Sequence, residues 1–284
     1  MRATMLPPVS DVLVALAHRL AEASGVVARR YFRTSVTVDD KADTSPVTIA
    51  DREIELMLRD ILRRTVPAHG IIGEEYGAEH ADAEWVWVLD PIDGTKAFIT
   101  GKPSFGTLIG LAWQGRPVLG IIDQPITGER WIGGSGVPAQ LNGKPIRVRP
   151  CARLAQACLY ATDPDMFRDP AVSRTAWERL ERAVKMRRFG ADCYAYGLLA
   201  AGFVDLVYEC RLKVHDHLPV TAVIEAAGGV VTDRRGRPAG MVSDICVVAA
   251  GDSRVHEQAL VLLNTGQSGE PTEAEPGNRG EELS

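Results

Sequence analysis

The sequence predicts a mixed α/β protein, with an α+β N-terminal part followed by an α/β C-terminal part. Two amphipathic helical segments come first, a run of strand-like segments follows, and helices alternate with strands after about residue 150. The chain has 284 residues, of which 45% are hydrophobic and 24% charged. A chain of this size and balance can bury a full core without disulfides or metals to staple it.

The two N-terminal helices are predicted from apolar side chains at helical spacing. Residues 9–32 carry such a stripe, with Ser10 and Asp11 as its capping signal, and residues 49–66 carry a second one. A short strand is expected near 36–38, between the two helices.

Strand signals dominate from residue 70 to residue 150. Short apolar runs predict strands at 71–72, 85–89, 107–112, 118–122, 130–132 and 146–148. The pair Asn142-Gly143 predicts a hairpin turn. We therefore expect the two helices to pack on a mostly antiparallel sheet.

Beyond residue 150 the pattern alternates. It predicts strands at 159–161, 204–208, 230–232 and 246–250, and helices at 172–185, 193–201, 219–227 and 252–263. We therefore expect two subdomains, at residues 1–149 and 150–264, followed by a tail at residues 265–284. The tail holds five Glu, one Arg and a single bulky apolar residue, so we expect it to be disordered.

Composition argues against several classes of protein. A net charge of −5 disfavours a nucleic-acid binder, which needs clustered Lys and Arg. No apolar run approaches the ~18 residues of a membrane helix, so we expect no membrane partner. The five cysteines are odd in number, widely spaced and without a C-x-x-C pair. We therefore expect reduced thiols in a cytoplasmic protein.

The strongest chemical signal lies at residues 90–95. The apolar strand at 85–89 ends in Asp90 and Asp93, Gly94 permits a tight turn, and Thr95 can open the next helix. Strand ends that lead into helix N-termini are natural sites for anions. These residues alone leave open a second interpretation, in which Asp93 caps a helix and Asp90 lies in a turn.

Three more acidic segments accompany this one. Glu74 and Glu75 follow another strand, Asp51 lies in the second helix ten residues after Lys41, and Asp216 precedes a late helix. Each could instead be a solvated turn, an exposed helix face or a helix cap, and Lys41 could be a neighbouring counter-charge or simply exposed. If four of these carboxylates met in one pocket, they would need compensating charge, which two Mg²⁺ ions would supply.

In this order the segments resemble the inositol-monophosphatase-like phosphatases, over about residues 10–263. The residues that carry the resemblance are Lys41…Asp51, Gly73-Glu74-Glu75, Asp90-Pro-Ile-Asp93-Gly-Thr95 and the late Asp216. The resemblance implies a layered αβαβα sandwich and a Mg²⁺-dependent, lithium-sensitive phosphomonoesterase. It also implies a homodimer, for which nothing in the sequence itself argues.

The resemblance further implies a metal-ligand set, with two or three Mg²⁺ ions per active site. Glu74, Asp90 and the backbone carbonyl of Ile92 would bind one ion. Asp90, Asp93 and Asp216 would bind the second, so that Asp90 bridges the pair. Oxygen ligands suit Mg²⁺, and two such ions can clamp the attacking and leaving oxygens of a displacement at phosphorus.

Catalytic and phosphate-binding roles are implied in the same way. Glu74 would orient a water that the metals activate, and Asp51 would accept the proton of the Thr95 hydroxyl, which faces that water. Asp93, with the backbone N–H groups of Gly94 and Thr95, would bind the substrate. There is no P-loop motif, which disfavours a P-loop nucleotide hydrolase.

The local sequences at residues 90–109, 120–133 and 190–196 resemble the histidinol-phosphatase branch of these enzymes. Histidinol phosphate carries an ammonium and an imidazole, so its pocket should offer carboxylates outside the metal cluster. Asp192 and Glu209 are the candidates, although Asp192 could equally cap the helix at 193–201.

The late motif departs from the inositol-specific members, which usually have Trp where this chain has His215. We expect His215 and His217 to pack rather than ligate, because Mg²⁺ disfavours imidazole.

The sequence thus favours a Mg²⁺-dependent phosphatase of L-histidinol phosphate, acting in histidine biosynthesis on a small phosphate monoester. The alternative is an inositol-1-phosphate phosphatase or a broad-specificity sugar or nucleotide phosphatase of the same kind. A catalytically idle relative is disfavoured, because none of the implied ligands is missing.

Overall fold

The computed structural model describes residues 6–35, 38–40, 46–168, 174–243 and 245–265. The expected acidic tail beyond residue 265 and Lys41 lie outside these residues. Within these ranges, no helix is both long enough and apolar enough to span a bilayer.

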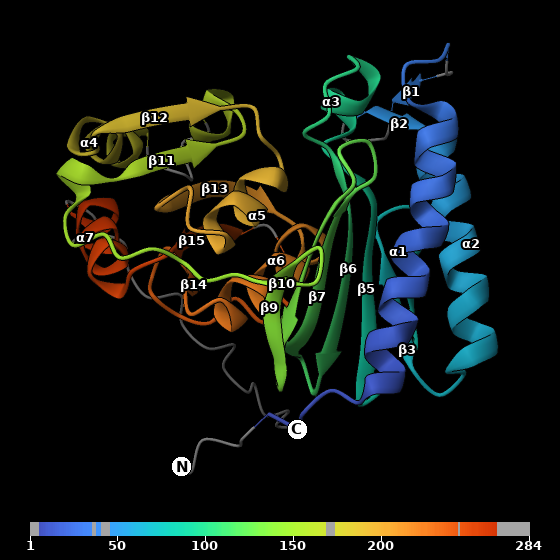
Figure 1. The fold of residues 1–284 in the computed structure, drawn as a ribbon. Coiled ribbons are helices and arrows are strands. Elements are labelled where there is room, and N and C mark those ends of the chain that lie inside the picture. The colour runs from blue at the N-terminus through green and yellow to red at the C-terminus, as the bar shows by residue number, and fades with distance from the viewer. Residues whose placement is uncertain (1–5, 36–37, 41–45, 169–173, 244, 266–284) are drawn as a thin grey trace, which may run out of the picture.

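The N-terminal half is built on an eight-stranded sheet, ordered β10-β9-β8-β7-β6-β5-β3-β4. Its strands are β3 (Gly70–Gly73), β4 (Gly77–Glu79), β5 (Trp85–Asp93), β6 (Gly106–Trp113), β7 (Arg116–Gln124), β8 (Glu129–Gly134), β9 (Val137–Leu141) and β10 (Lys144–Pro145). All neighbours are antiparallel except β3 and β5, which run parallel. Helices α1 (Asp11–Tyr31) and α2 (Ile49–Thr65) cover one face (Figure 1).

The C-terminal half is built on a five-stranded sheet, ordered β12-β11-β13-β15-β14. Its strands are β11 (Cys158–Ala161), β12 (Met186–Phe189), β13 (Leu206–Leu212), β14 (Val230–Asp233) and β15 (Ile245–Ala250). Helices α5 (Tyr194–Ala200) and α6 (Val214–Ala226) lie between the two sheets, and α4 (Arg174–Ala183) and α7 (Ser253–Asn264) lie on the outer side (Figure 1).

Small elements complete the fold. They are strands β1 (Val38–Asp40) and β2 (Pro46–Thr48), helix α3 (Thr95–Ile99), and the 3₁₀ helices η1 (Leu154–Gln156) and η2 (Pro164–Phe167). The whole arrangement is a layered αβαβα sandwich, as the resemblance implied. The division at residue 150 stays a prediction, because α6 packs against strands of both sheets.

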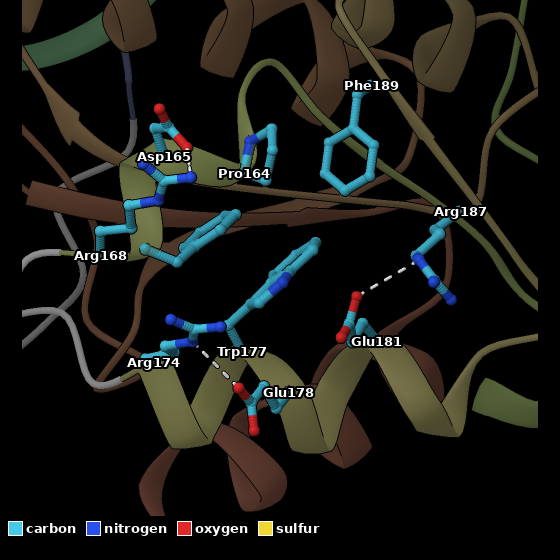
Figure 2. A pocket seen from close by; sticks show the side chains of 10 residues that line it. Pro164, Asp165, Arg168, Arg174, Trp177, Glu178, Glu181, Arg187 and Phe189 are labelled. Atoms are coloured by element: carbon cyan, nitrogen blue, oxygen red, sulfur yellow. Dashed lines mark hydrogen bonds and ion pairs between the residues drawn. The ribbon is translucent and has the colours of Figure 1, made fainter.

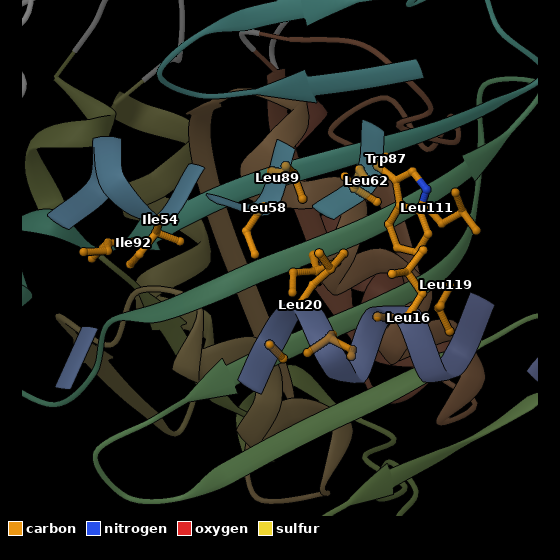
Figure 3. Packing of buried hydrophobic residues seen from close by; sticks show 14 of the residues in the cluster. Leu16, Leu20, Ile54, Leu58, Leu62, Trp87, Leu89, Ile92, Leu111 and Leu119 are labelled. Atoms are coloured by element: carbon orange, nitrogen blue, oxygen red, sulfur yellow. The ribbon is translucent and has the colours of Figure 1, made fainter. Parts of the chain in front are cut away.

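The core beneath α1 and α2 holds the sheet that carries the acidic residues. Both helices supply leucines to this core, Leu16 and Leu20 from α1 and Leu58 and Leu62 from α2. They face Trp87 and Leu89 of β5, as Figure 3 shows, and all six side chains are buried. Burying such side chains contributes about 1.5–3 kcal/mol each. This packing against α1 and α2 therefore holds in place the strand that ends in Asp90 and Asp93.

Some predicted elements were wrong. Residues 146–148 form no strand, because the N–H of Val148 donates to the carbonyl of Ala227 at the end of α6 rather than to a neighbouring strand. Helix α6 begins at Val214 rather than 219, so Asp216 lies inside its first turn. The Asn142-Gly143 turn is confirmed, and it joins β9 to β10 with positive φ at both residues.

The expectation of five reduced cysteines was also wrong. Cys210 and Cys246 form a disulfide, because β13 and β15 are antiparallel neighbours that bring the two residues face to face. The remaining cysteines, Cys151, Cys158 and Cys193, are free and buried.

Candidate active site

The end of β5 supplies two carboxylates. Asp90 and Asp93 flank a register shift between β5 and β6, and this irregularity lies where the strand leaves the regular ladder. Asp90 is 2% exposed. Asp93 Oδ2 accepts a hydrogen bond from the N–H of Cys193 at 2.6 Å, which ties the strand end to the start of α5.

Glu74 and Asp216 reach the same place from other elements. Glu74 follows β3, which pairs in parallel with β5, and its N–H donates to the carbonyl of Leu89 at 3.2 Å. Asp216 lies in the first turn of α6, where its Oδ2 accepts the N–H of Lys213 at 2.7 Å. Asp216 therefore caps its helix and also faces the cluster.

The carboxylates converge closely enough to hold cations. One oxygen from each of Asp90, Asp93 and Asp216 lies within 4.8 Å of the other two. In a second group, one oxygen of Glu74, one oxygen of Asp90 and a ring nitrogen of His215 also lie within 4.8 Å of one another. Asp90 belongs to both groups, so it lies where a bridging ligand would.

Burial and mutual repulsion act on the carboxyl groups of this cluster. Burial raises the pKa of Asp90 well above its usual range, and the nearby carboxylates Glu74, Asp93 and Asp216 raise it further. Burial and Asp216 do the same to the pKa of Asp93. The pKa of Asp216 is also raised by burial, although His215 opposes the shift.

Asp90 also has an oxygen with nothing to bind it. Its Oδ1 is buried and has no hydrogen-bond partner among the described residues. An unpaired buried carboxylate oxygen is costly, and a hard divalent cation is the partner that such an oxygen suits. The residues present therefore fit a divalent-metal centre.

Asp51 and Thr95 lie together beside this cluster. Thr95 Oγ is 3.4 Å from Asp51 Oδ1 and 3.2 Å from the carbonyl oxygen of Ile92. The other oxygen of Asp51 accepts hydrogen bonds from the N–H and hydroxyl of Thr48 at the N-terminus of α2. Burial raises the pKa of Asp51 to about 6. Asp51 is both a helix cap and a candidate proton acceptor.

Asp192 packs on the turn that follows Asp93. Gly94 has φ +82°, and a Cβ there would lie 2.7 Å from Cγ of Asp192. Asp192 does not cap α5, whose N-cap is Cys193. Its Oδ2 instead accepts the hydroxyl of Ser104 at 2.8 Å. Burial raises its pKa, while Ser104, Lys102 and Lys96 oppose the shift.

Glu209 is a buried carboxylate outside the metal-ligand cluster. It is 3% exposed, on β13, and its Oε2 accepts the hydroxyl of Tyr196 at 2.9 Å. Burial raises its pKa to about 7, against the effect of Thr162 and Tyr196, and Asp192 adds to the rise. Its Oε1 has no hydrogen-bond partner in the part of the chain that the structure describes.

Sequence reasoning missed Glu55 and Arg59. Both are fully buried in α2, and Arg59 Nε lies 2.8 Å from Glu55 Oε1. Glu55 Oε2 accepts the N–H of Glu75 at 2.7 Å, and Oε1 accepts that of Tyr76 at 3.1 Å. A Cβ at Gly73 would overlap the Glu55 carboxylate. Glu55 thus holds the turn that carries Glu74.

Comparison with known proteins identifies the relatives of this chain. Its sequence matches the inositol monophosphatase family over residues 10–267. The chain belongs to the inositol monophosphatase family. It is therefore a member of a family of phosphatases that use divalent metal ions and act on small phosphate esters.

Individual relatives in this family carry different names. The chain is 50% identical to "Bifunctional phosphatase IMPL2, chloroplastic" of Arabidopsis thaliana, covering 89% of this chain and 75% of that protein. It is 33% identical to a histidinol-phosphatase of Mycobacterium tuberculosis, over 90% and 98% of the two chains. A solved inositol monophosphatase from Zymomonas mobilis is 43% identical, with a TM-score of 0.82 and coverage of 89% and 98%.

A pocket of about 270 Å³ lies away from the carboxylate cluster, between η2, α4 and β12 (Figure 2). Trp177 and Phe189 line it beside charged side chains that pair with one another: Arg168 with Asp165, Arg174 with Glu178, and Arg187 with Glu181. None of the predicted site residues lines this pocket.

Proposed function

We propose that this member of the inositol monophosphatase family hydrolyses L-histidinol phosphate to L-histidinol and phosphate, a step of histidine biosynthesis. The observation that carries the proposal is Glu209, a buried carboxylate outside the metal-ligand cluster whose Oε1 has no partner among the described residues. A buried carboxylate oxygen without a partner is costly, and a bound cation stabilises it. Histidinol phosphate brings such a cation, whereas a neutral inositol ring does not.

Two further features support this substrate. Asp192 adds to the rise in the pKa of Glu209, so a cation bound near the two carboxylates would relieve part of that repulsion. Asp192 also packs on Gly94, the residue that we expect at the phosphate. Among the relatives, those named histidinol-phosphatase occur in Chlorobaculum parvum, Mycobacterium tuberculosis and Streptomyces coelicolor.

The proposed metal ligands are Glu74, Asp90, the Ile92 carbonyl, Asp93 and Asp216, around two or three Mg²⁺ ions. Bound Mg²⁺ supplies positive charge to the phosphate and lowers the pKa of a nearby water. Asp90 and Asp93 hold the cluster at a fixed strand end, and Asp216 closes it from α6. Four carboxylates from three separate elements are thereby kept in one place before substrate arrives.

The proton relay is proposed for Thr95 and Asp51. The Thr95 hydroxyl donates to Asp51 and accepts a proton from the attacking water, while Glu74 orients that water. Because Asp51 is also fixed by Thr48, its free oxygen stays aimed at Thr95. The backbone N–H groups of Gly94 and Thr95 are proposed to bind the phosphate oxygens.

The alternative substrate is an inositol phosphate or another sugar or nucleotide phosphate. The 43% identity to the Zymomonas mobilis inositol monophosphatase favours it. Phosphate and metals contribute much of the binding for any such ester, so the specificity rests on the carboxylates.

The deciding experiment compares kcat/KM for L-histidinol phosphate and inositol 1-phosphate, with and without Mg²⁺. We expect a preference of at least about tenfold for histidinol phosphate, about 1.4 kcal/mol. Glu209→Gln should raise KM for histidinol phosphate and leave KM for inositol 1-phosphate nearly unchanged. A preference for inositol 1-phosphate in the wild type would overturn the proposal, and equal effects of Glu209→Gln on both esters would remove Glu209 from recognition.

A homodimer and a cytoplasmic location also stay proposals. Sedimentation analysis of the purified protein checks the first. For the second, the name of the Arabidopsis relative places that protein in the chloroplast, so localisation of the tagged full chain is the direct test.

A further inference from the structure

The cluster includes a potential ligand that is not a carboxylate. A ring nitrogen of His215, one oxygen of Glu74 and one of Asp90 all lie within 4.8 Å of one another. Ligands at about 2.1 Å from an ion in an octahedron lie about 3–4.2 Å apart. The three atoms are therefore near enough for a small shift of the side chains to place all of them around a single ion.

His215 is held in this position by the fold. It lies in the first turn of α6, its side chain is only 12% exposed, and its Nε2 is 3.4 Å from Asp216 Oδ1. The buried Oδ1 of Asp90, which lacks a hydrogen-bond partner among the described residues, is a separate indication that the cluster takes a cation. The imidazole therefore belongs to a cluster in which one carboxylate oxygen lacks a partner among the described residues.

We propose that His215 is a ligand in the cluster, and that the position formed by Glu74, Asp90 and His215 prefers a transition-metal dication to Mg²⁺. The inference rests on the metal centre of the proposed function. Carboxylate and water ligands suit Mg²⁺, while imidazole suits ions such as Co²⁺ and Zn²⁺. One nitrogen among oxygens therefore changes which ion the position selects, and the group formed by Asp90, Asp93 and Asp216 keeps the chemistry of Mg²⁺.

A competing role for His215 is to orient Asp216 by donating an N–H to it. A residue that only orients a ligand affects every metal in the cluster to a similar degree. A direct nitrogen ligand acts selectively, because Mg²⁺ gains little from imidazole. The two roles are therefore separated by comparing two metals rather than by measuring activity.

The experiment is calorimetric titration of the metal-free protein with Co²⁺ alone and with Mg²⁺ alone. We expect His215→Phe, which keeps a ring but removes both nitrogens, to weaken the tightest Co²⁺ binding at least about tenfold. Mg²⁺ affinity should change by less than about threefold. The control is His80→Asn, an exposed histidine at φ +46°, where Asn is tolerated; it should alter neither affinity. Equal loss of both metals, or loss of neither, would overturn the proposal.

A second measurement uses the wild-type protein, so it does not depend on the folding of a variant. Proton NMR of the Co²⁺-loaded protein should contain a strongly shifted, solvent-exchangeable N–H resonance from a bound imidazole, and its absence would contradict the assignment. If the wild type bound neither Co²⁺ nor Mg²⁺, the metal centre of the proposed function would fail. If it bound both but without that resonance, only the role of His215 would fail.

Discussion

Asp51 and Glu55 lie one turn apart on the same face of α2, and both are buried. Asp51 reaches the Thr95 hydroxyl, and Glu55 accepts the backbone N–H groups of Glu75 and Tyr76. One helix therefore fixes two segments of the candidate active site, the turn after β3 and the start of α3. A change in either carboxylate should affect the site as well as stability.

Glu55→Ala should be strongly destabilising. It leaves the buried Arg59 with only the partly exposed Glu79 as a carboxylate partner, and it frees the turn that carries Glu74. Removing one partner of a buried ion pair costs about 3–5 kcal/mol. We expect a loss of that size in denaturant unfolding, together with weaker Mg²⁺ binding by the folded fraction.

The matched control for this change is Glu53→Ala on the same helix. Glu53 contacts Arg30 and Tyr31 at the surface, where such pairs contribute about 0–1 kcal/mol. If both variants lost the same small amount of stability, the turn would not depend on Glu55.

The pH profile should reveal Asp51. Burial raises its pKa to about 6, and only its ionised form can accept a proton from Thr95. Bound Mg²⁺ nearby can only lower that pKa, so kcat should rise with pH along a limb centred at or below pH 6, and level off above it. Asp51→Asn should lower kcat by about 10²–10⁴-fold, the usual contribution of a general base, and remove the limb.

Thr95→Ser and Thr95→Val provide the comparison for this relay. The serine keeps a hydroxyl toward Asp51, while the valine keeps the shape and loses it. We expect the serine variant to retain most of kcat and the valine variant to resemble Asp51→Asn. Full activity in the valine variant would exclude the relay.

The carboxylates could be found from the sequence because each lies next to the end of a strand or the start of a helix, which apolar runs and capping residues indicate. Asp90 and Asp93 end an apolar strand, and Glu74 follows another. Asp51 and Asp216 lie in the first turns of helices, where an acidic residue is conspicuous. Local patterns therefore predicted most of the elements and drew attention to these acidic residues, whereas the layers and the ligand set were implied by the family resemblance, and the roles of the ligands stay predictions.

Other residues could not be found in this way. Glu55 and Arg59 are four apart in a helix, a pattern typical of an exposed ion pair. Only the packing of the turn at residues 73–79 buries them. The Cys210–Cys246 pairing is likewise a property of strand register, because the two cysteines lie 36 positions apart in sequence. Such features need a structure, since they depend on contacts between distant segments.

Metal removal should destabilise the protein most at high pH. Burial and mutual repulsion raise the pKa values of Asp90, Asp93 and Asp216 above their unfolded values. Each raised carboxyl contributes stability that is fully present below its unfolded pKa, near 4, and is lost as pH rises through the folded pKa. Added Mg²⁺ should therefore raise Tm more at pH 8 than at pH 5.5.

The size of this effect follows from mass action. A ligand at about 100 times its Kd stabilises the folded state by about 2.7 kcal/mol. Thermal unfolding after chelation, with Mg²⁺ restored stepwise at both pH values, measures it. An equal increment at the two pH values would mean that these carboxylates do not form the metal centre.

Gly94→Ala should impair both the backbone and the site. The residue has φ +82°, which costs a side-chain-bearing residue about 1–2 kcal/mol, and the new Cβ would lie 2.7 Å from Cγ of Asp192. The matched control is Gly128→Ala, at φ +72°, whose Cβ would have nothing within 4 Å. Denaturant unfolding should show a loss of stability in both variants, and a larger one in Gly94→Ala because of the clash with Asp192. Only Gly94→Ala should also raise KM for histidinol phosphate, because it displaces Asp192, and an unchanged KM would place Asp192 outside the substrate pocket.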